Sequence, residues 1–232
     1  MAANYIFAEE QFVKSQKSDT GLHLISGPSS NSWCTLDYPR GAQLCFQGCA
    51  AEGVFRIVDG SAKECFTSES GRMAILRIAG PGDLIGLEAV LCSGQYANTV
   101  QALEPTKACF LTKRDLLGAL RCDEKFRMQV VHQLGDRCKT AYTDIRRFAL
   151  TTSVAGRFAH FLLGWKRTRP GRESCPEIQI NLTHEEIGQL LCTSRETISR
   201  LVSDFRQKGW ITITGVRWRI QDRRALAALG QI

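Results

Sequence analysis

Four polar side chains near the C-terminal end of the chain have the spacing of a surface that reads bases. Arg195, Glu196, Ser199 and Arg200 stand at i, i+1, i+4 and i+5, which places them on one face of a helix. An arginine guanidinium can donate two hydrogen bonds to guanine, a glutamate can accept one from cytosine, and a serine can adapt to either. These residue types therefore predict contacts with base edges in the major groove of DNA.

A helix-turn-helix is the element that would position this face. Residues 183–186, Thr-His-Glu-Glu, match a capping box, so a first helix is expected to start there and run through Leu191. A turn at Cys192-Thr193 follows, Ser194 is placed to cap the second helix, and Gly209 to end it. The residues of the second helix expected to face inward are Ile198, Leu201, Val202 and Phe205. A hairpin of two ordinary helices with solvated charges is the plainer interpretation.

The residues around this unit favour the DNA-binding interpretation because they predict a wing. A short strand is expected at 177–180, and residues 210–221 read as a hairpin that turns at Thr214-Gly215. Arg217 and Arg219 fall on one side of it, where they would lie along phosphates. The predicted DNA-contacting residues are Thr183, Thr193, Ser194, Arg195, Glu196, Thr197, Ser199, Arg200 and Arg217.

Charge is distributed unevenly along the 232 residues, whose net charge is +7. Residues 1–149 hold 17 Lys and Arg against 16 Asp and Glu, whereas residues 150–232 hold 13 against 7. The excess thus lies in the segment with the predicted helix-turn-helix, which suits a phosphate-binding module. No run of about 18 apolar residues predicts a membrane span, and residues 1–17 lack the pattern of a signal peptide. We therefore expect a cytoplasmic protein without a membrane partner.

Two further segments have different periodicities. From about Trp33 to Leu111, short apolar runs such as 54–58, 73–78 and 108–111 alternate with glycine-containing turns, which predicts a sandwich or roll of strands. After Lys113 the apolar period becomes helical. The long stripe predicts a dimer seam, and packing on the chain's own sheet is the alternative. Its members are Phe126, Val130, Leu134, Cys138, Ala141, Ile145 and Phe148. The helix should break at residues 151–153, with a new helix over 154–166 and a polar loop over 167–176.

The ten cysteines indicate neither a disulfide framework nor a zinc site. Without a secretory signal they are expected to be reduced thiols, and none forms a Cys-x-x-Cys pair. A redox enzyme that uses Cys45 or Cys49 is an alternative function, although no histidine lies near either in sequence. A ligand-sensing module that signals through protein contacts alone is another.

Residues 185–201, EEIGQLLCTSRETISRL, closely resemble the recognition motif of the family of the cyclic-AMP receptor protein and the oxygen regulator FNR. Residues 80–86, GPGDLIG, resemble the turn before that family's effector pocket. Residues 101–104, QALE, resemble the corresponding sequence of the FNR branch. The resemblance covers about residues 33–230 and implies an α+β protein, homodimeric and not an enzyme. The implied domains are a β-roll sensor (1–112), a dimerisation helix (113–150) and a winged helix-turn-helix (151–232). It also implies RNA polymerase as a partner, with the 167–176 loop as the candidate contact.

Within the reading face the chain resembles a hybrid of the two branches. Arg195, Glu196 and Arg200 match the base-reading positions of the cyclic-AMP branch, and Ser199 matches the FNR branch. An arginine at position 195 implies half-sites nearer TGTGA than TTGAT, in an inverted repeat. Both branches place glycine where this chain has Cys192, so we expect a left-handed backbone there at a cost of about 1 kcal/mol. A thiol so close to DNA would also make binding sensitive to oxidants.

The resemblance leaves the effector unassigned. The corresponding pocket region is Gly86, Leu87, Glu88, Ala97 and Asn98. The cyclic-AMP branch has glutamate and arginine where this chain has Leu87 and Ala97, so ribose and phosphate would lack their partners. Cys109 matches an FNR cluster cysteine, but no cysteine precedes Cys34, so an FNR-type iron–sulfur cluster is not expected. Neither cyclic AMP nor that cluster is therefore predicted as a cofactor, and the histidines show no metal spacing.

Overall fold

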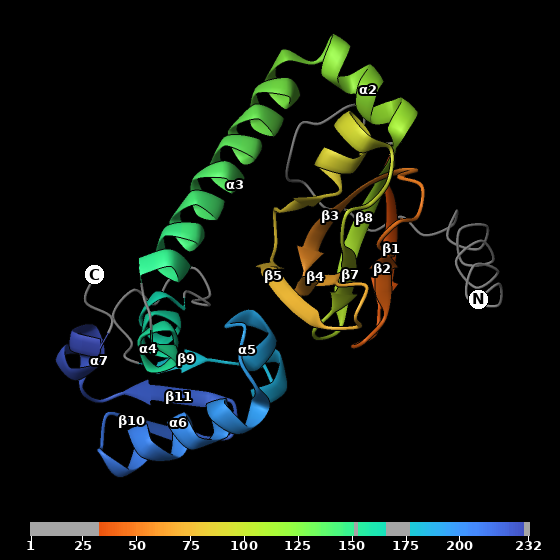
Figure 1. Cartoon of the computed structure of the whole chain (residues 1–232). Coiled ribbons are helices and arrows are strands. Elements are labelled where there is room, and N and C mark those ends of the chain that lie inside the picture. Colours follow the sequence, from red (N-terminus) through yellow and green to blue (C-terminus); the bar gives the residue numbers. More distant parts are fainter. Residues whose placement is uncertain (1–32, 151–152, 166–176, 230–232) are drawn as a thin grey trace. The chain divides into compact units, whose positions relative to one another are not determined.

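The computed structural model describes residues 33–150, 153–165 and 177–229 (Figure 1). The predicted 167–176 loop and residues 151–152 of the predicted break lie outside these ranges. The strands are β1 (Cys34–Tyr38), β2 (Gln43–Cys45), β3 (Gly53–Asp59), β4 (Ala62–Thr67), β5 (Met73–Ala79), β6 (Leu84–Ile85), β7 (Thr99–Ala102), β8 (Thr106–Thr112), β9 (Glu177–Gln179), β10 (Ile211–Thr214) and β11 (Arg217–Ile220). The helices are η1 (Ala89–Ser93), α2 (Lys113–Cys122), α3 (Glu124–Leu150), α4 (Val154–Gly164), α5 (His184–Leu190), α6 (Arg195–Gln207) and α7 (Arg223–Leu229).

Two antiparallel four-stranded sheets form the N-terminal β-roll. Their strand orders are β1-β8-β3-β6 and β2-β7-β4-β5. One apolar core contains residues of both sheets, among them Val54 and Leu111 of the first and Ala62 and Val100 of the second. The β-roll and the three sequence-predicted strands, which correspond to β3, β5 and β8, are therefore confirmed. The chain divides into two compact units. The main division falls within α3, after Gly135, and residues 71–76, which include the start of β5, group with the second unit.

The helical stretch after Lys113 is broken once, at Asp123. This residue has an extended backbone (φ −115°, ψ 102°) and ends α2. Its Oδ1 accepts a hydrogen bond from the backbone N–H of Phe126 at 2.9 Å, which satisfies a free donor in the first turn of α3. The carboxylate thus separates a ten-residue helix from the 27-residue α3.

The C-terminal unit combines α4 to α7 with a three-stranded antiparallel sheet of order β10-β11-β9. Ser153 caps α4, since its Oγ accepts from the Gly156 N–H at 3.0 Å, as the predicted break at this residue requires. The expected hairpin is confirmed, with Thr214 paired to Arg217. The sequence interpretation missed that β9 joins this hairpin through the pair Trp218–Ile178.

Candidate nucleic-acid interface

The first helix of the predicted helix-turn-helix is α5, and a reciprocal capping box fixes its start. The Thr183 hydroxyl accepts from the Glu186 N–H at 3.1 Å, and the Glu186 carboxylate accepts from the Thr183 N–H at 2.9 Å. Two of the four free N–H groups of the helix are satisfied in this way. The predicted capping box is confirmed, and it places the Thr183 side chain at the exposed start of α5.

The turn between α5 and α6 depends on a positive φ at one residue and on the absence of a side chain at another. Cys192 has a φ of 53°, which confirms the left-handed backbone expected at this position. Gly188 was not singled out from the sequence, although a Cβ there would lie 2.8 Å from the Thr193 carbonyl oxygen. The same two residues are also joined by a backbone hydrogen bond, since the Thr193 N–H donates to the Gly188 carbonyl at 2.9 Å. Gly188 therefore allows the turn to pack directly on α5.

The inner face of α6 is held on an aromatic core. Ile198, Val202 and Phe205 are buried, as expected, and Leu201 is half-buried. The Phe205 ring lies 5.3 Å from that of Phe158 in α4 and 5.2 Å from that of Trp210. Aromatic contacts at these distances add to the stabilisation from burial. The helix is thus supported over about two turns, which fixes the direction of its exposed face.

That exposed face carries the predicted base-reading residues. Arg195, Glu196 and Arg200 are exposed. Ser199 is half-buried, and its hydroxyl shares a hydrogen bond of 2.9 Å with Nδ1 of His184, the first residue of α5. This contact was not predicted, because it joins residues 15 positions apart on two helices.

Glu196 is poised to remain an ionised acceptor. A hydrogen bond with its own backbone N–H, a further one from the Ser194 side chain, and the charges of Arg195 and Arg200 together lower the pKa of Glu196. Ser194 is also the N-cap of α6, accepting from the Thr197 N–H at 3.2 Å. The two hydroxyls, of Ser194 and Thr197, lie 3.1 Å apart. The face therefore presents two cations around one carboxylate at the N-terminus of a helix.

The wing presents one of its two predicted arginines without an acidic partner. Arg219 forms an ion pair of 3.2 Å with Glu177 of β9, a neighbour that the sequence interpretation did not foresee. Arg217 is exposed, and within the described part of the chain no ion pair of its side chain is found. A positive φ of 60° at Gly215 forms the tight turn between the strands. Of the two, Arg217 has its charge available for a phosphate.

The predicted dimer stripe on α3 needs a correction. Phe126 and Val130 are buried in the core of the roll, and Leu134 packs against that core. For these three residues the alternative, packing on the chain's own sheet, is therefore correct. Cys138, Ala141, Ile145 and Phe148 are exposed. The helix also exposes three large apolar side chains that were not predicted, those of Met128, Val131 and Tyr142.

The residues expected around an effector do not share one environment. Leu87 is fully buried in the core, whereas Ala97 is exposed. Gly86 has a φ of 82° and packs under Tyr96. Close to Glu88, the carboxylate of Glu64 in β4 lies 2.6 Å from the Arg77 guanidinium of β5. Leu87 and Ala97 thus cannot both line one site.

Cys45, one of the two cysteines considered as a redox nucleophile, is not an activated thiol. Burial, with a further contribution from the Glu64 charge, raises the pKa of Cys45 to about 12, so its thiol stays protonated. The nine cysteines within the described ranges are free thiols. No group of three or more His, Cys, Asp or Glu side chains that could hold a metal was found in that part of the chain. The redox-enzyme alternative therefore receives no support from Cys45.

A search of the described helices found none with the length and apolarity needed to cross a membrane.

Comparisons with known proteins agree with this division of the chain. Residues 35–123 match the model of the cyclic nucleotide-binding domain, and residues 156–229 match that of the Crp-like helix-turn-helix domain. The regulatory protein HlyX of Actinobacillus pleuropneumoniae is 31% identical over 180 residues, which is 75% of this chain and 72% of HlyX. The CRP-like cAMP-activated global transcriptional regulator of Mycobacterium tuberculosis is 27% identical over 194 residues, or 83% and 86% of the two chains.

A solved structure supports the fold independently. The structure of FixK2 from Bradyrhizobium japonicum superposes with a TM-score of 0.74 at 20% identity, covering 86% of this chain and 98% of FixK2. At this identity the likeness concerns the fold alone. It agrees with the observed order of β-roll, long helix and helix-turn-helix unit.

Proposed function

Because the chain belongs to the CRP/FNR family of transcription regulators, we propose that it binds DNA as a homodimer and reads TGTGA-like half-sites in an inverted repeat. The observation that carries this proposal is the exposed face of α6, on which Arg195 and Arg200 flank the ionised Glu196. Both arginines can donate twice to a guanine, and the glutamate can accept from a cytosine amino group. The protein would act on chromosomal DNA, in the cytoplasm.

Other polar groups near the two helix starts would hold the phosphates. Thr183 and Ser194 cap α5 and α6, so the N–H groups of both helix N-termini and the adjacent hydroxyls of Thr193 and Thr197 would face the backbone of the DNA. Arg217 on the wing adds a charge without an acidic partner in the described chain. Such contacts set the register of α6 in the groove without reading sequence themselves.

Exposed apolar residues on α3 support the homodimer. Along the helix the spacings between Met128, Val131, Cys138, Tyr142 and Ile145 are three, seven, four and three residues, which aligns them on one face. Tyr142 is 71% exposed and Ile145 64% exposed, which is unusual for such side chains in a protein without a partner. We propose that this face, in place of the stripe that begins at Phe126, forms the seam with a second copy.

An effector other than cyclic AMP fits the sensor better. The Leu87 side chain is part of the core and carries no group for a ribose. Arg77, a cation close to this region, is already paired with Glu64 and would have to give up that partner to bind a phosphate.

Selection of oligonucleotides from a randomised pool tests the proposed function. We expect the enriched sequences to contain two inverted half-sites about one helical turn apart, each with the guanine of TGTGA that Arg195 would contact. The bound fraction should decrease steeply as salt increases, because phosphate contacts release counterions. A consensus with TTGAT half-sites would show that Arg195 does not read a base, and enrichment without any inverted repeat would contradict the dimeric mode.

The left-handed residue in the turn gives a separate prediction. Cys192→Gly should raise the free energy of unfolding by about 1 kcal/mol, because glycine adopts a φ of 53° without steric cost. Chemical denaturation measures this change, and Cys192→Ala is the matched control, since it removes the thiol but keeps the strain. Operator affinity should be unchanged in both variants. Because Cys192 is exposed beside the proposed DNA surface, any loss of DNA binding on oxidation should disappear in Cys192→Gly. A full oxidant response in that variant would exclude this thiol as its origin.

A further inference from the structure

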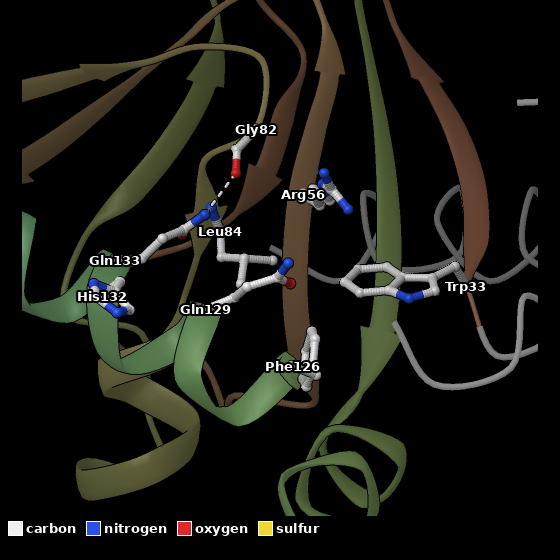
Figure 2. Close-up of a pocket in the computed structure, with 8 residues that line it drawn as sticks. All are labelled: Trp33, Arg56, Gly82, Leu84, Phe126, Gln129, His132 and Gln133. Carbon is white, nitrogen blue, oxygen red and sulfur yellow. Dashed lines mark hydrogen bonds between the residues drawn. The ribbon is translucent and has the colours of Figure 1, made fainter. Parts of the chain in front are cut away.

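A pocket of about 350 Å³ lies between the first turns of α3 and the β-roll, away from the residues expected around an effector (Figure 2). Residues 86–88 and 97–98 do not line it. Its walls come from β3, from β6 and the turn before it, from α3, and from the residue preceding β1. They are Trp33, Arg56, Gly82, Leu84, Phe126, Gln129, His132 and Gln133.

Strand register places the pocket on the face of the β1-β8-β3-β6 sheet opposite to Phe55 and Ile57. Both of these neighbours of Arg56 in β3 are buried, and alternation directs the Arg56 side chain to the other face. Leu84 of β6 is paired with Arg56, and so lines the same face. Figure 2 shows Arg56 and Leu84 on the sheet side and Phe126, Gln129, His132 and Gln133 on the helix side.

The described residues that line this pocket carry a positive charge without a negative one. Among the described residues that line it, Arg56 is the one charged side chain apart from His132, and none of these residues is a carboxylate. No ion pair or hydrogen bond of the Arg56 side chain is found with any residue in the described ranges. Burial lowers the pKa of the guanidinium, whereas the nearby Cys109 thiol acts in the opposite direction. A partly desolvated cation without a counter-ion gains free energy when an anion binds beside it.

The walls of the pocket are held in place without a ligand. Gln133 of α3 donates from Nε2 to the Gly82 carbonyl at 2.8 Å and accepts from the Leu84 N–H at 3.1 Å. These two hydrogen bonds fasten the helix to the turn before β6. Phe126 and Val130, which precede Gln133 on α3, are buried in the core. The site is thus largely preformed, as is usual for small-molecule sites.

We propose that this pocket binds a small aromatic monocarboxylate. The Arg56 guanidinium would hold the carboxylate in a two-point contact, and the Trp33 and Phe126 rings would contact the aromatic body. The Gln129 amide, which extends into the same space, supplies a donor and an acceptor for a ring substituent (Figure 2). The single arginine suits a ligand with one negative charge, and the volume of the pocket suits a ligand with one or two rings.

Most of the pocket residues on α3 lie on a different face of the helix from the proposed seam. Phe126, Gln129 and Gln133 stand at i, i+3 and i+7, on one face of α3. Val131 and Tyr142 lie about half the helix circumference away from these three residues, whereas the lining residue His132 follows Met128 by one turn and stands at the edge of the proposed seam. A ligand held by both β3 and α3 should therefore stabilise the roll whether or not the chain is dimeric.

Calorimetric titration of the full-length protein with benzoate, phenylacetate and indole-3-acetate tests the proposal. At least one of the three should bind with a dissociation constant of about 1 mM or tighter and raise the unfolding temperature. The corresponding uncharged amides should bind at least 10-fold more weakly. Arg56→Gln should reduce carboxylate binding at least 10-fold while leaving the weak binding of the amides unchanged.

Arg114→Gln is the matched control, because it removes the same charge from a side chain of the same unit that is 94% exposed. It should bind the carboxylates as the wild type does. Absence of binding by all three carboxylates would overturn the proposal, and so would equal binding by wild type and Arg56→Gln. These titrations contain no DNA, so their failure is distinct from a failure of the proposed function.

Discussion

Arg195→Ala and Arg200→Ala are each expected to weaken binding to the selected operator by about 1–3 kcal/mol, or roughly 5- to 150-fold. Both side chains are exposed, whereas Ile198 and Phe205 are buried, so removal of the arginines leaves the packing of the helix intact. Each loses a two-point contact with a guanine, and the loss should be larger for the operator than for random DNA. Competition binding with operators that differ at single base pairs measures this difference.

Arg224→Ala is the control for the arginine variants. Arg224 is an exposed residue of α7, in the same unit but outside the two helices and the wing, so its removal changes the net charge equally. This variant should weaken the binding of operator DNA and of random DNA by the same small factor, because it loses only the long-range attraction of one charge to the phosphates. Arg195→Ala and Arg200→Ala variants that bound the operator as well as the wild type would show that α6 is not the recognition helix.

Local features of the helix-turn-helix were predictable because they depend on residues close in sequence. The capping box of Thr183 and Glu186 spans four residues. The left-handed backbone of Cys192 was expected from the glycine that both branches of the family place in this short turn. The contacts that join separate elements were not predictable in this way. The His184–Ser199 hydrogen bond and the Arg219–Glu177 ion pair follow from the angle between α5 and α6 and from the pairing of β9 with β11.

The apolar stripe on α3 shows a second limit of sequence patterns. Helical spacing indicates that Phe126, Val130, Cys138 and Ile145 belong to apolar rows, but burial in the chain's own core and burial against a partner produce the same spacing. Only the β-roll, which covers the first of these residues, separates the two outcomes. The pocket around Arg56 is similar, because its residues come from β3, β6 and α3 and share no motif.

The His184–Ser199 contact also bears on how the two branches of the family combine in this chain. Ser199 matches the FNR branch, but this residue is half-buried and its hydroxyl is hydrogen-bonded to His184, whereas Arg195, Glu196 and Arg200 are exposed. A serine held in this way contributes less to base reading than a free one, since its hydrogen bond must be exchanged for one to a base. This geometry supports half-sites nearer to those of the cyclic-AMP branch.

The double variant Tyr142→Asp/Ile145→Asp is expected to be monomeric and to bind the operator at least 100-fold more weakly than the wild type. Two carboxylates on each copy would face each other across the proposed seam, where apolar side chains that are 71% and 64% exposed now lie. A monomer can occupy one half-site only, so it loses the gain that comes from linking two binding events. Sedimentation velocity measures the mass, and a binding isotherm on the full operator measures the affinity.

Thr140→Asp separates this effect from a general effect of charge. Thr140 is exposed on α3, two residues before Tyr142, and helical geometry places it about half a turn away from the proposed seam. This variant should remain dimeric and bind as the wild type does. A dimeric Tyr142→Asp/Ile145→Asp protein would place the seam elsewhere. A monomer that kept full operator affinity would mean that each copy binds independently, and the inverted repeat would then have no role in recognition.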